Sequence, residues 1–251
     1  MKHFVIIITF IGLCSCKQSP YALTEIEAHQ LSVDSTLVAN DSIEGFILPY
    51  HNRINEVLDS TLAYAPTMIT KDDGKYNTTA GNLMADIVFE AANPIYKART
   101  GNELDFVLLN HGGIRSIISK GKVSARTAFE VMPFENTIVV VDLTGKSVEK
   151  LVKYLMNSKR AHPISGIQVV LNKSGALKSF KIQGKPLDTE RTYHIATSNY
   201  LVTGGDNMGF FKEAVRITDT DYLIRNAMID HFKKVDTIAP KIDDRFYKLG
   251  I

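Results

Sequence analysis

The sequence predicts an α+β domain in which a mixed β-sheet is layered with helices. Two observations support this class. Strand-like runs at 167–171 and 177–182 are joined by a hairpin-like turn at 172–175. Other strand-like runs stand singly and are separated by segments with apolar residues at helical spacing. Hairpins combined with single strands favour a mixed sheet over a purely parallel one.

The first predicted elements are two helices. Residues 41–59 place apolar side chains at helical spacing after Asp41, a candidate capping residue, and we expect Pro49 to kink this helix. Residues 79–92 follow Thr78 and carry one apolar stripe, which predicts a second helix.

The next elements alternate strand and helix. Residues 104–109 form a short, nearly continuous apolar run, which is typical of a strand buried on both faces. The run ends at Asn110, where a ligand loop is expected because such loops gather at strand ends. Residues 137–143 predict a second strand, and a helix is expected to begin at Thr144.

Three strands and one helix complete the predicted domain. The strands cover 167–171, 177–182 and 192–198. The last helix is expected over 221–233, with Tyr222 among the residues on its core side.

The N-terminus resembles a secretory signal. Lys2 precedes an apolar run at 4–13, and residues 13–16 form a lipoprotein cleavage box. The apolar run is too short for a membrane span, so we expect residues 1–16 to be a signal peptide and Cys16 to be lipidated. This predicts an exported bacterial lipoprotein, membrane-anchored on the periplasmic face or the cell surface.

The rest of the chain divides into two parts. Residues 17–40 are polar and without periodicity, as expected of a tether, and 41–251 are expected to form the folded domain. The hydrophobic content of 45% is enough for one sizeable core. The formal net charge of +2, spread over both signs, argues against binding of a nucleic-acid polymer.

Three motifs suggest a ligand pocket. Arg115 follows a glycine pair, where backbone N–H groups and a guanidinium can grip an anion, although a turn with a surface arginine is the simpler interpretation. Phe134 and Tyr200 could hold a flat base between two rings, although a single such aromatic is more often a core residue. Asp206 follows another glycine pair and could accept hydrogen bonds from ribose hydroxyls, or could simply cap its own turn.

Five ordered segments carry a family resemblance. They are residues 81–86, 110–115, 133–136, 143–145 and 199–206. Together they resemble the C-terminal, substrate-binding domain of the 5′-nucleotidase and UDP-sugar hydrolase family, and this resemblance covers most of the chain from about residue 41. It implies the fold of that domain.

The resemblance also implies roles for individual residues. Asn110 and Arg115 would contact the ribose and phosphate side of a nucleotide, and Phe134 and Tyr200 would clamp the base. Asp206 would bind the ribose hydroxyls. The implied substrate-binding set is Asn110, Gly112, Gly113, Arg115, Phe134, Asn136, Tyr200, Gly204, Gly205 and Asp206.

The sequence departs from the family pattern at three places. Tyr200 replaces a phenylalanine, and residues 207–210 replace a shorter step after the aspartate. An arginine that the family often carries before 81–86 is missing, where Lys71 or Lys75 could substitute as a point charge.

The family's hydrolytic centre is not recognisable in the sequence. Family members cleave phosphate esters with a separate N-terminal domain that holds two metal ions. We find neither its metal-binding motifs nor a nucleophile and base pair, so no catalytic or metal-ligating residue is assigned in this chain. Two divalent metals are expected in a partner phosphoesterase chain.

The resulting hypothesis is a nucleotide- or nucleoside-recognition domain, the substrate-binding half of a split exported 5′-nucleotidase that acts in nucleotide breakdown. Two alternatives stay open. The chain could be a stand-alone lipoprotein that captures nucleotides or nucleosides, or a degenerate domain whose pocket residues only support the fold.

Overall fold

The computed structural model describes residues 23–250, so the predicted signal peptide and the predicted lipidation site Cys16 lie outside the described residues. Residues 23–40 are exposed and contain no helix or strand. Within 23–250, no helix combines the length and apolar character needed to cross a membrane.

Helix α2 (Asp41–Asp59) has the predicted bounds but a different cap. The side chain of Asn40, rather than Asp41, accepts hydrogen bonds from the first free N–H groups of the helix. The helix runs through Pro49 as one element and contains no buried residue. Packing contacts divide the chain between Leu48 and Pro49, and the second unit holds all the strands described below.

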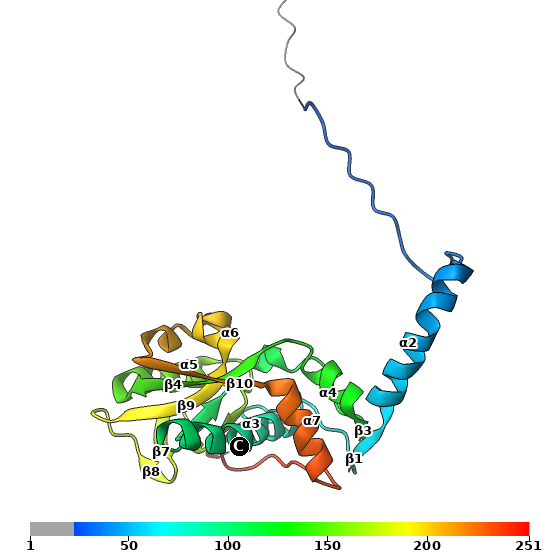
Figure 1. Cartoon of the computed structure of the whole chain (residues 1–251). Coiled ribbons are helices and arrows are strands. Elements are labelled where there is room, and N and C mark those ends of the chain that lie inside the picture. The colour runs from blue at the N-terminus through cyan, green and yellow to red at the C-terminus, as the bar shows by residue number, and fades with distance from the viewer. Residues whose placement is uncertain (1–22, 251) are drawn as a thin grey trace, which may run out of the picture. The chain divides into compact units, whose positions relative to one another are not determined.

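A five-stranded mixed sheet forms the centre of the second unit (Figure 1). In spatial order its strands are β10 (Arg216–Leu223), β4 (Thr137–Thr144), β9 (Thr192–Ser198), β2 (Phe106–Leu108) and β5 (Ile164–Ser165). Strands β9 and β2 are parallel, and every other neighbouring pair is antiparallel. The predicted α+β class with a mixed sheet is therefore confirmed.

Two smaller sheets accompany the central one. The first contains β11 (Phe246–Lys248), β6 (Ile167–Leu171), β7 (Leu177–Ile182) and β8 (Lys185–Pro186), and the second pairs β1 (Thr61–Ala65) with β3 (Gly121–Ser124). Strands β6 and β7 form the predicted antiparallel hairpin, with Ile167 opposite Ile182. Strand β11 then adds to β6 in parallel.

The central sheet is buried on both faces because its side chains alternate between two cores. Val107 and Val140 face one core, whereas Phe106 and Val141 face the other. The first core is covered by α3 (Thr79–Thr100), α4 (Ala125–Val131) and α7 (Ile224–Lys234), and the second by α5 (Gly145–Asn157), the short 3₁₀ helix η3 (Gly209–Glu213) and the β6–β7 hairpin.

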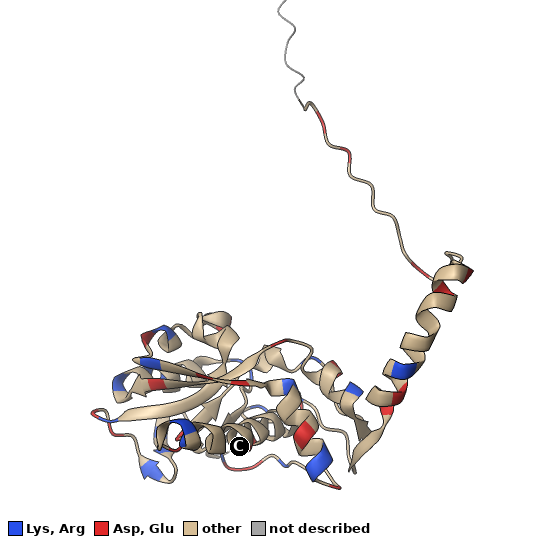
Figure 2. Cartoon of the chain, in the orientation of Figure 1, with Lys and Arg blue, Asp and Glu red and all other residues tan. Residues whose placement is uncertain are grey.

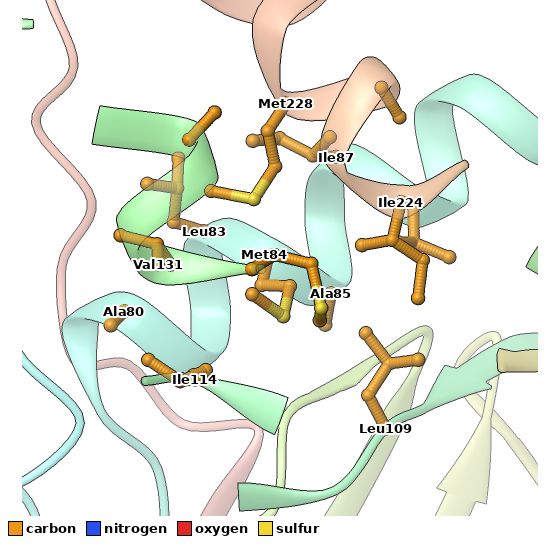
Figure 3. Packing of buried hydrophobic residues seen from close by; sticks show 14 of the residues in the cluster. Ala80, Leu83, Met84, Ala85, Ile87, Leu109, Ile114, Val131, Ile224 and Met228 are labelled. Atoms are coloured by element: carbon orange, nitrogen blue, oxygen red, sulfur yellow. The ribbon is translucent and has the colours of Figure 1, made fainter. Parts of the chain in front are cut away.

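Helix α3 is the main element of the first core. Thr78 caps it as predicted, by accepting the N–H of Gly81 at 3.1 Å. Figure 3 shows Met84 of this helix surrounded by apolar side chains, including Leu109 and Ile114. Because these last two residues bracket the turn after β2, the core fixes both ends of that turn.

Several predicted bounds were wrong. Helix α3 does not stop at residue 92 but continues through Pro94 to Gly101, which ends it in a left-handed conformation with φ of 78°. Strand β2 is shorter than predicted. The last helix begins at Ile224 rather than 221, because Tyr222 and Leu223 continue strand β10 along the edge of β4.

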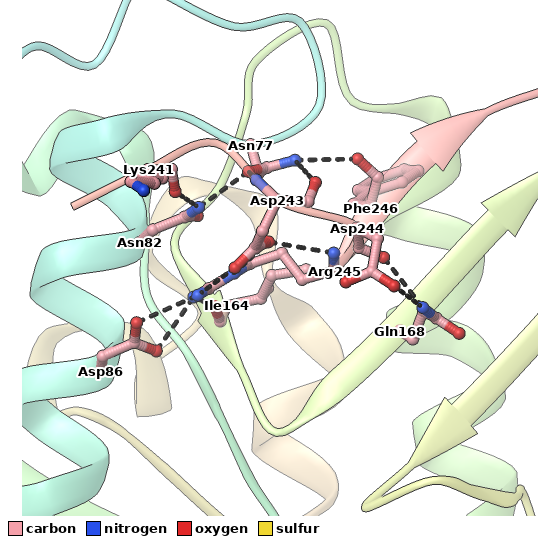
Figure 4. Close-up of polar contacts among 10 residues, drawn as sticks. All are labelled: Asn77, Asn82, Asp86, Ile164, Gln168, Lys241, Asp243, Asp244, Arg245 and Phe246. Atoms are coloured by element: carbon pink, nitrogen blue, oxygen red, sulfur yellow. Dashed lines mark hydrogen bonds and ion pairs between the residues drawn. The ribbon is translucent and has the colours of Figure 1, made fainter.

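The C-terminal segment is tied to the start of α3 by a polar cluster that we call the clasp, defined by Asn77, Asn82, Asp86, Asp243 and Arg245 (Figure 4). The Arg245 side chain is 14% exposed and donates to both carboxylates at 2.7 to 3.0 Å. Its remaining N–H donates to the backbone oxygen of residue 164 at 2.7 Å. All five guanidinium N–H groups are thereby satisfied.

Electrostatics at Arg245 follow from this pairing. Burial alone lowers the pKa of the guanidinium, but the hydrogen bonds to Asp243 and Asp86 outweigh it and raise that pKa above its ordinary value.

Asn77 adds further hydrogen bonds to the clasp, since its amide donates to two backbone oxygens of the C-terminal segment and its carbonyl accepts from Asn82 at 2.8 Å. The motif residues Asn82 and Asp86 therefore belong to a structural cluster.

Candidate functional site

The motifs that suggested a ligand pocket converge on one cavity of about 410 Å³. It lies beyond the carboxyl ends of the parallel neighbours β2 and β9, where ligand loops gather in such sheets. The lining residues are Asn110, Gly112, Gly113, Arg115, Phe134, Asn136, Arg160, Tyr200 and Asp206. Of the predicted set, only Gly204 and Gly205 do not line it, and Arg160 was not predicted.

The first wall of the pocket is the turn after β2. Asn110 leads into the short 3₁₀ helix η1 (His111–Gly113). A Cβ atom on Gly113 would lie 3.0 Å from the Asn110 side-chain oxygen, so the glycine allows the amide to fold back over the turn. The N–H of Arg115 then donates to the backbone oxygen of Val131 at 2.8 Å, which joins the turn to the end of α4.

A short hydrogen bond connects the two loops of the site. The Asn110 amide nitrogen donates to the Asp206 carboxylate at 2.6 Å. Asp206 lies in η2 (Gly205–Asn207) with φ of 51°, in the left-handed region that non-glycine residues seldom adopt. The Tyr154 hydroxyl fixes this loop to α5 by donating to the Asp206 backbone oxygen at 2.9 Å.

His162 is a buried side chain that makes several hydrogen bonds to the residues behind the pocket. Its Nδ1 accepts the backbone N–H of His111 at 3.3 Å, so we assign the proton of the neutral ring to Nε2. Nε2 lies 2.9 Å from the Ser158 hydroxyl and 3.3 Å from the Tyr154 hydroxyl. Burial, with a smaller effect of His111, lowers the pKa of His162 to about 4. The ring therefore stays neutral near pH 7 and links the turn after β2 to Tyr154 of α5, which in turn bonds the Asp206 loop.

Phe134 is positioned by an arginine that sequence reasoning missed. Arg225 of α7 is 5% exposed, and it donates to the backbone oxygens of Pro133 at 3.2 Å and Phe134 at 3.4 Å. It also forms an ion pair with Glu135 and lies 4.2 Å from the ring centre of Phe129. The Phe134 ring itself is 40% exposed, so its loop is fixed while the ring faces the pocket. No local sequence signal marks Arg225.

Tyr200 forms another wall. It lies in α6 (Asn199–Val202), directly after β9, and is 45% exposed. A Cβ atom on Gly205 would lie 2.5 Å from the Tyr200 ring, so this glycine makes room for the ring. Gly204 has φ of 91° and turns the chain toward Asp206. The two glycines thus shape the loop from behind.

The cationic side chains of the site come from three segments. The Arg115 guanidinium lies 5.8 Å from the ring centre of Phe134, and Arg160 reaches the pocket from the segment between α5 and β5. Lys71 donates to the backbone oxygen of Ile114 at 2.6 Å, whereas Lys75 lies over the ring of Tyr76. Lys71 and Lys75 were the two lysines considered in place of the missing arginine. Of these two, Lys71 contacts the turn after β2 and Lys75 does not.

The pocket combines aromatic, cationic and carboxylate groups of the kind that can contact a flat ring, an anion and neighbouring hydroxyls. Burial, followed by Lys71 and Arg160, lowers the pKa of the nearby His111 imidazole, which favours its neutral form. Within residues 23–250, no group of three or more His, Cys, Asp or Glu side chains is arranged to hold a metal ion.

Comparison with known proteins identifies the family. A family model described as the C-terminal domain of 5′-nucleotidase matches residues 60–213. The trifunctional nucleotide phosphoesterase YfkN of Bacillus subtilis is 28% identical over 86% of this chain and 16% of its own length. The protein UshA of Escherichia coli is 30% identical over 68% of this chain and 30% of its own length.

Solved structures show the same fold. The 5′-nucleotidase precursor of Thermus thermophilus superposes with a TM-score of 0.69 at 24% identity, covering 84% of this chain and 44% of its own. The chain thus spans less than half the length of each relative named here. On its family match and its fold, the chain belongs to the 5′-nucleotidase family through that family's C-terminal domain.

Proposed function

We propose that the pocket binds a nucleotide or nucleoside and that the chain acts as the substrate-recognition part of a 5′-nucleotidase in nucleotide breakdown. One observation carries this proposal. Two half-exposed aromatic rings, a guanidinium and an amide–carboxylate pair line the same cavity of about 410 Å³. This volume is in the range of ordinary small-molecule sites.

Each part of the nucleotide has a partner in the proposal. The base stacks on Phe134 and Tyr200, with Asn136 at the base edge or the sugar. The ribose hydroxyls donate to Asp206, which Asn110 holds in place at 2.6 Å. The phosphate lies against Arg115, whose planar guanidinium can form two parallel hydrogen bonds to phosphate oxygens.

Hydrolysis belongs to a second component in this proposal. A separate metallophosphoesterase chain would supply the two divalent metals, and this chain would present the substrate. Relatives more than twice as long, one of them named a nucleotide phosphoesterase, support a division of labour of this kind, because the rest of their length could carry the hydrolytic part. A lipid at Cys16 would raise the effective concentration of the two partners by holding them on one membrane surface.

Calorimetric titration with AMP and adenosine tests the binding role. Replacing Phe134 or Tyr200 with Ala should weaken binding by about 1 to 3 kcal/mol, because each ring would stack on the base. The same variants should lose little stability, since both side chains are half-exposed. A structural role would instead lower the free energy of unfolding by about 3 to 5 kcal/mol and leave no affinity to measure.

Phosphate release separates the remaining alternatives. The purified chain with Mn²⁺, Co²⁺ or Zn²⁺ should release no phosphate from AMP, and addition of a metallophosphoesterase partner should produce turnover that depends on Phe134 and Tyr200. Turnover by this chain alone would contradict the split-enzyme proposal. Tight nucleoside binding without any stimulation of a phosphoesterase would favour a capture protein.

A further inference from the structure

The arginines of this chain fall into two groups. All nine lie within the described residues, and seven of them form ion pairs with a carboxylate. The seven paired arginines are Arg53, Arg99, Arg126, Arg191, Arg216, Arg225 and Arg245. The two without a carboxylate partner among residues 23–250 are Arg115 and Arg160, and both line the pocket.

These two arginines have spare hydrogen-bonding capacity. Arg115 makes one long hydrogen bond, 3.4 Å, to the backbone oxygen of Gly112. Arg160 uses its backbone groups to bond the Ser158 side chain, but its guanidinium has no hydrogen-bond partner within the described chain. A guanidinium has five N–H donors, so most of the donors of both side chains are available to a ligand.

The charge of the pocket is also unbalanced. Two guanidinium groups line it against one carboxylate, Asp206. The Asp206 carboxylate is occupied in part by the amide of Asn110. Lys71, which contacts the turn in front of the pocket, adds a third positive charge nearby. An anion that enters the pocket therefore meets a positive field that the protein does not neutralise.

We propose that Arg160 is a second anion-binding side chain, acting with Arg115, and that it makes the pocket select a nucleotide whose phosphate carries two negative charges over the corresponding nucleoside. This inference rests on the proposed function, because it assumes that the base and ribose occupy the same pocket. It adds a specificity-determining residue that the family resemblance did not supply. A doubly charged phosphate has three free oxygens, which is enough to engage two guanidinium groups from different segments.

The experiment compares Arg160→Gln with a matched control. Lys159→Gln removes the same charge from the neighbouring position, which is exposed and does not line the pocket. Calorimetric titrations with AMP, adenosine and pyrophosphate would be run on the wild type, both variants and Arg115→Gln. Because Arg160 is exposed and has no carboxylate partner among residues 23–250, Arg160→Gln should fold normally, and a thermal melt checks this.

The expected result is a loss that depends on the phosphate. Arg160→Gln should weaken AMP binding by about tenfold or more, while adenosine binding changes by less than about twofold. Lys159→Gln should change AMP binding by less than about threefold, because an exposed charge outside the contact is screened by solvent and salt. Arg115→Gln should show the same selective loss as Arg160→Gln.

Two results would overturn the inference. The first is equal loss of AMP affinity in Arg160→Gln and Lys159→Gln, and the second is a wild-type protein that binds adenosine as tightly as AMP. In either case adenosine binding that depends on Phe134 would leave the proposed function standing. Conversely, if AMP and adenosine both fail to bind while pyrophosphate binding depends on both arginines, the proposed function fails and the anion site remains.

Discussion

The pocket and the clasp are built from the same residue types but differ in how completely these are satisfied. In the clasp, all five N–H groups of Arg245 meet an oxygen, and the amide of Asn77 bonds on both sides. In the pocket, Arg115 has one long hydrogen bond and the Arg160 guanidinium has no partner within residues 23–250. Both regions also contain an asparagine whose side-chain amide is held by hydrogen bonds, Asn77 in the clasp and Asn110 in the pocket.

This difference separates a structural polar cluster from a binding one. The clasp leaves the buried Asn82 oxygen without a partner, but its N–H donors are engaged, so an anion could bind there only by breaking existing hydrogen bonds. An unsaturated pair of guanidinium groups at a cavity keeps its donors for an incoming anion. The number of free donors is therefore more informative about function here than the presence of arginine. Figure 2 shows that basic and acidic residues are interspersed along the described chain.

The largest expected effect is in the clasp. Arg245→Ala removes a mostly buried guanidinium and its hydrogen bonds to the half-exposed carboxylates of Asp86 and Asp243, which should cost about 3 kcal/mol of unfolding free energy. Urea denaturation followed by circular dichroism measures it. Arg245→Lys is the control, since it keeps the charge but loses the planar fork and should fall between wild type and Ala. An Ala variant as stable as wild type would mean that saturation does not mark a structural cluster.

The next effect concerns His162, which lies under the pocket but is saturated like the clasp. Its pKa is about 4 in the folded protein and 6.5 in the unfolded chain, so above pH 6.5 the ring is neutral in both states. As the pH falls from 6.5 to 4, only the unfolded chain gains the proton, and stability is lost by at most about 3 kcal/mol. His162→Gln should show a shallower loss over this window in urea titrations. Parallel curves for the two proteins would contradict the assigned role.

A smaller effect is expected at Gly205, which supports a pocket residue from behind. In Gly205→Ala the new Cβ meets the Tyr200 ring, so the ring must shift and AMP affinity should fall by about 1 kcal/mol or more. Gly209→Ala is the matched control, because its Cβ would meet nothing within 4 Å. In a Tyr200→Ala background, Gly205→Ala should have no additional effect on affinity. An undiminished effect there would show that the glycine acts through another contact.

The smallest expected effect is on an exposed ion pair, which tests whether pairing without burial stabilises the fold. Arg53 pairs with Glu56 at 2.9 Å on α2, and both side chains are 71% exposed. Arg53→Ala should change the unfolding free energy by no more than about 0.5 kcal/mol, as measured by urea denaturation, because exposed ion pairs contribute little. A loss comparable with that of Arg245→Ala would mean that pairing alone, rather than pairing with burial, distinguishes the clasp.

The buried elements of the fold were predictable from the sequence. Strands β4, β6 and β9 agree with the predicted ranges within one residue, because their apolar and β-branched patterns report burial directly. Strand β10 was not predicted, since it is a polar edge strand that gains its structure from pairing with β4. Tyr222 was assigned to the last helix for the same reason.

The pocket was predictable where its residues lie in recognisable motifs. Residues after strand ends, such as Asn110 and Asp206, come together because β2 and β9 are parallel neighbours. Arg160 and Arg225 carry no local signal, and only tertiary structure places one in the pocket and the other behind the Phe134 loop. The role of Asp86 was equally hidden, since its partner Arg245 lies 159 residues further along the chain.

That sequence separation has a consequence for the order of folding. Strand pairs in the central sheet already join distant residues, such as Phe106 and Ile195, but the clasp must close a still longer loop of 159 residues before Asp86 meets Arg245. We expect the C-terminal segment to dock last and to be released first in native-state hydrogen exchange. The ligand loops are anchored in the sheet and in α5, so this release would leave the pocket assembled, and the chain would have an open form that can still bind.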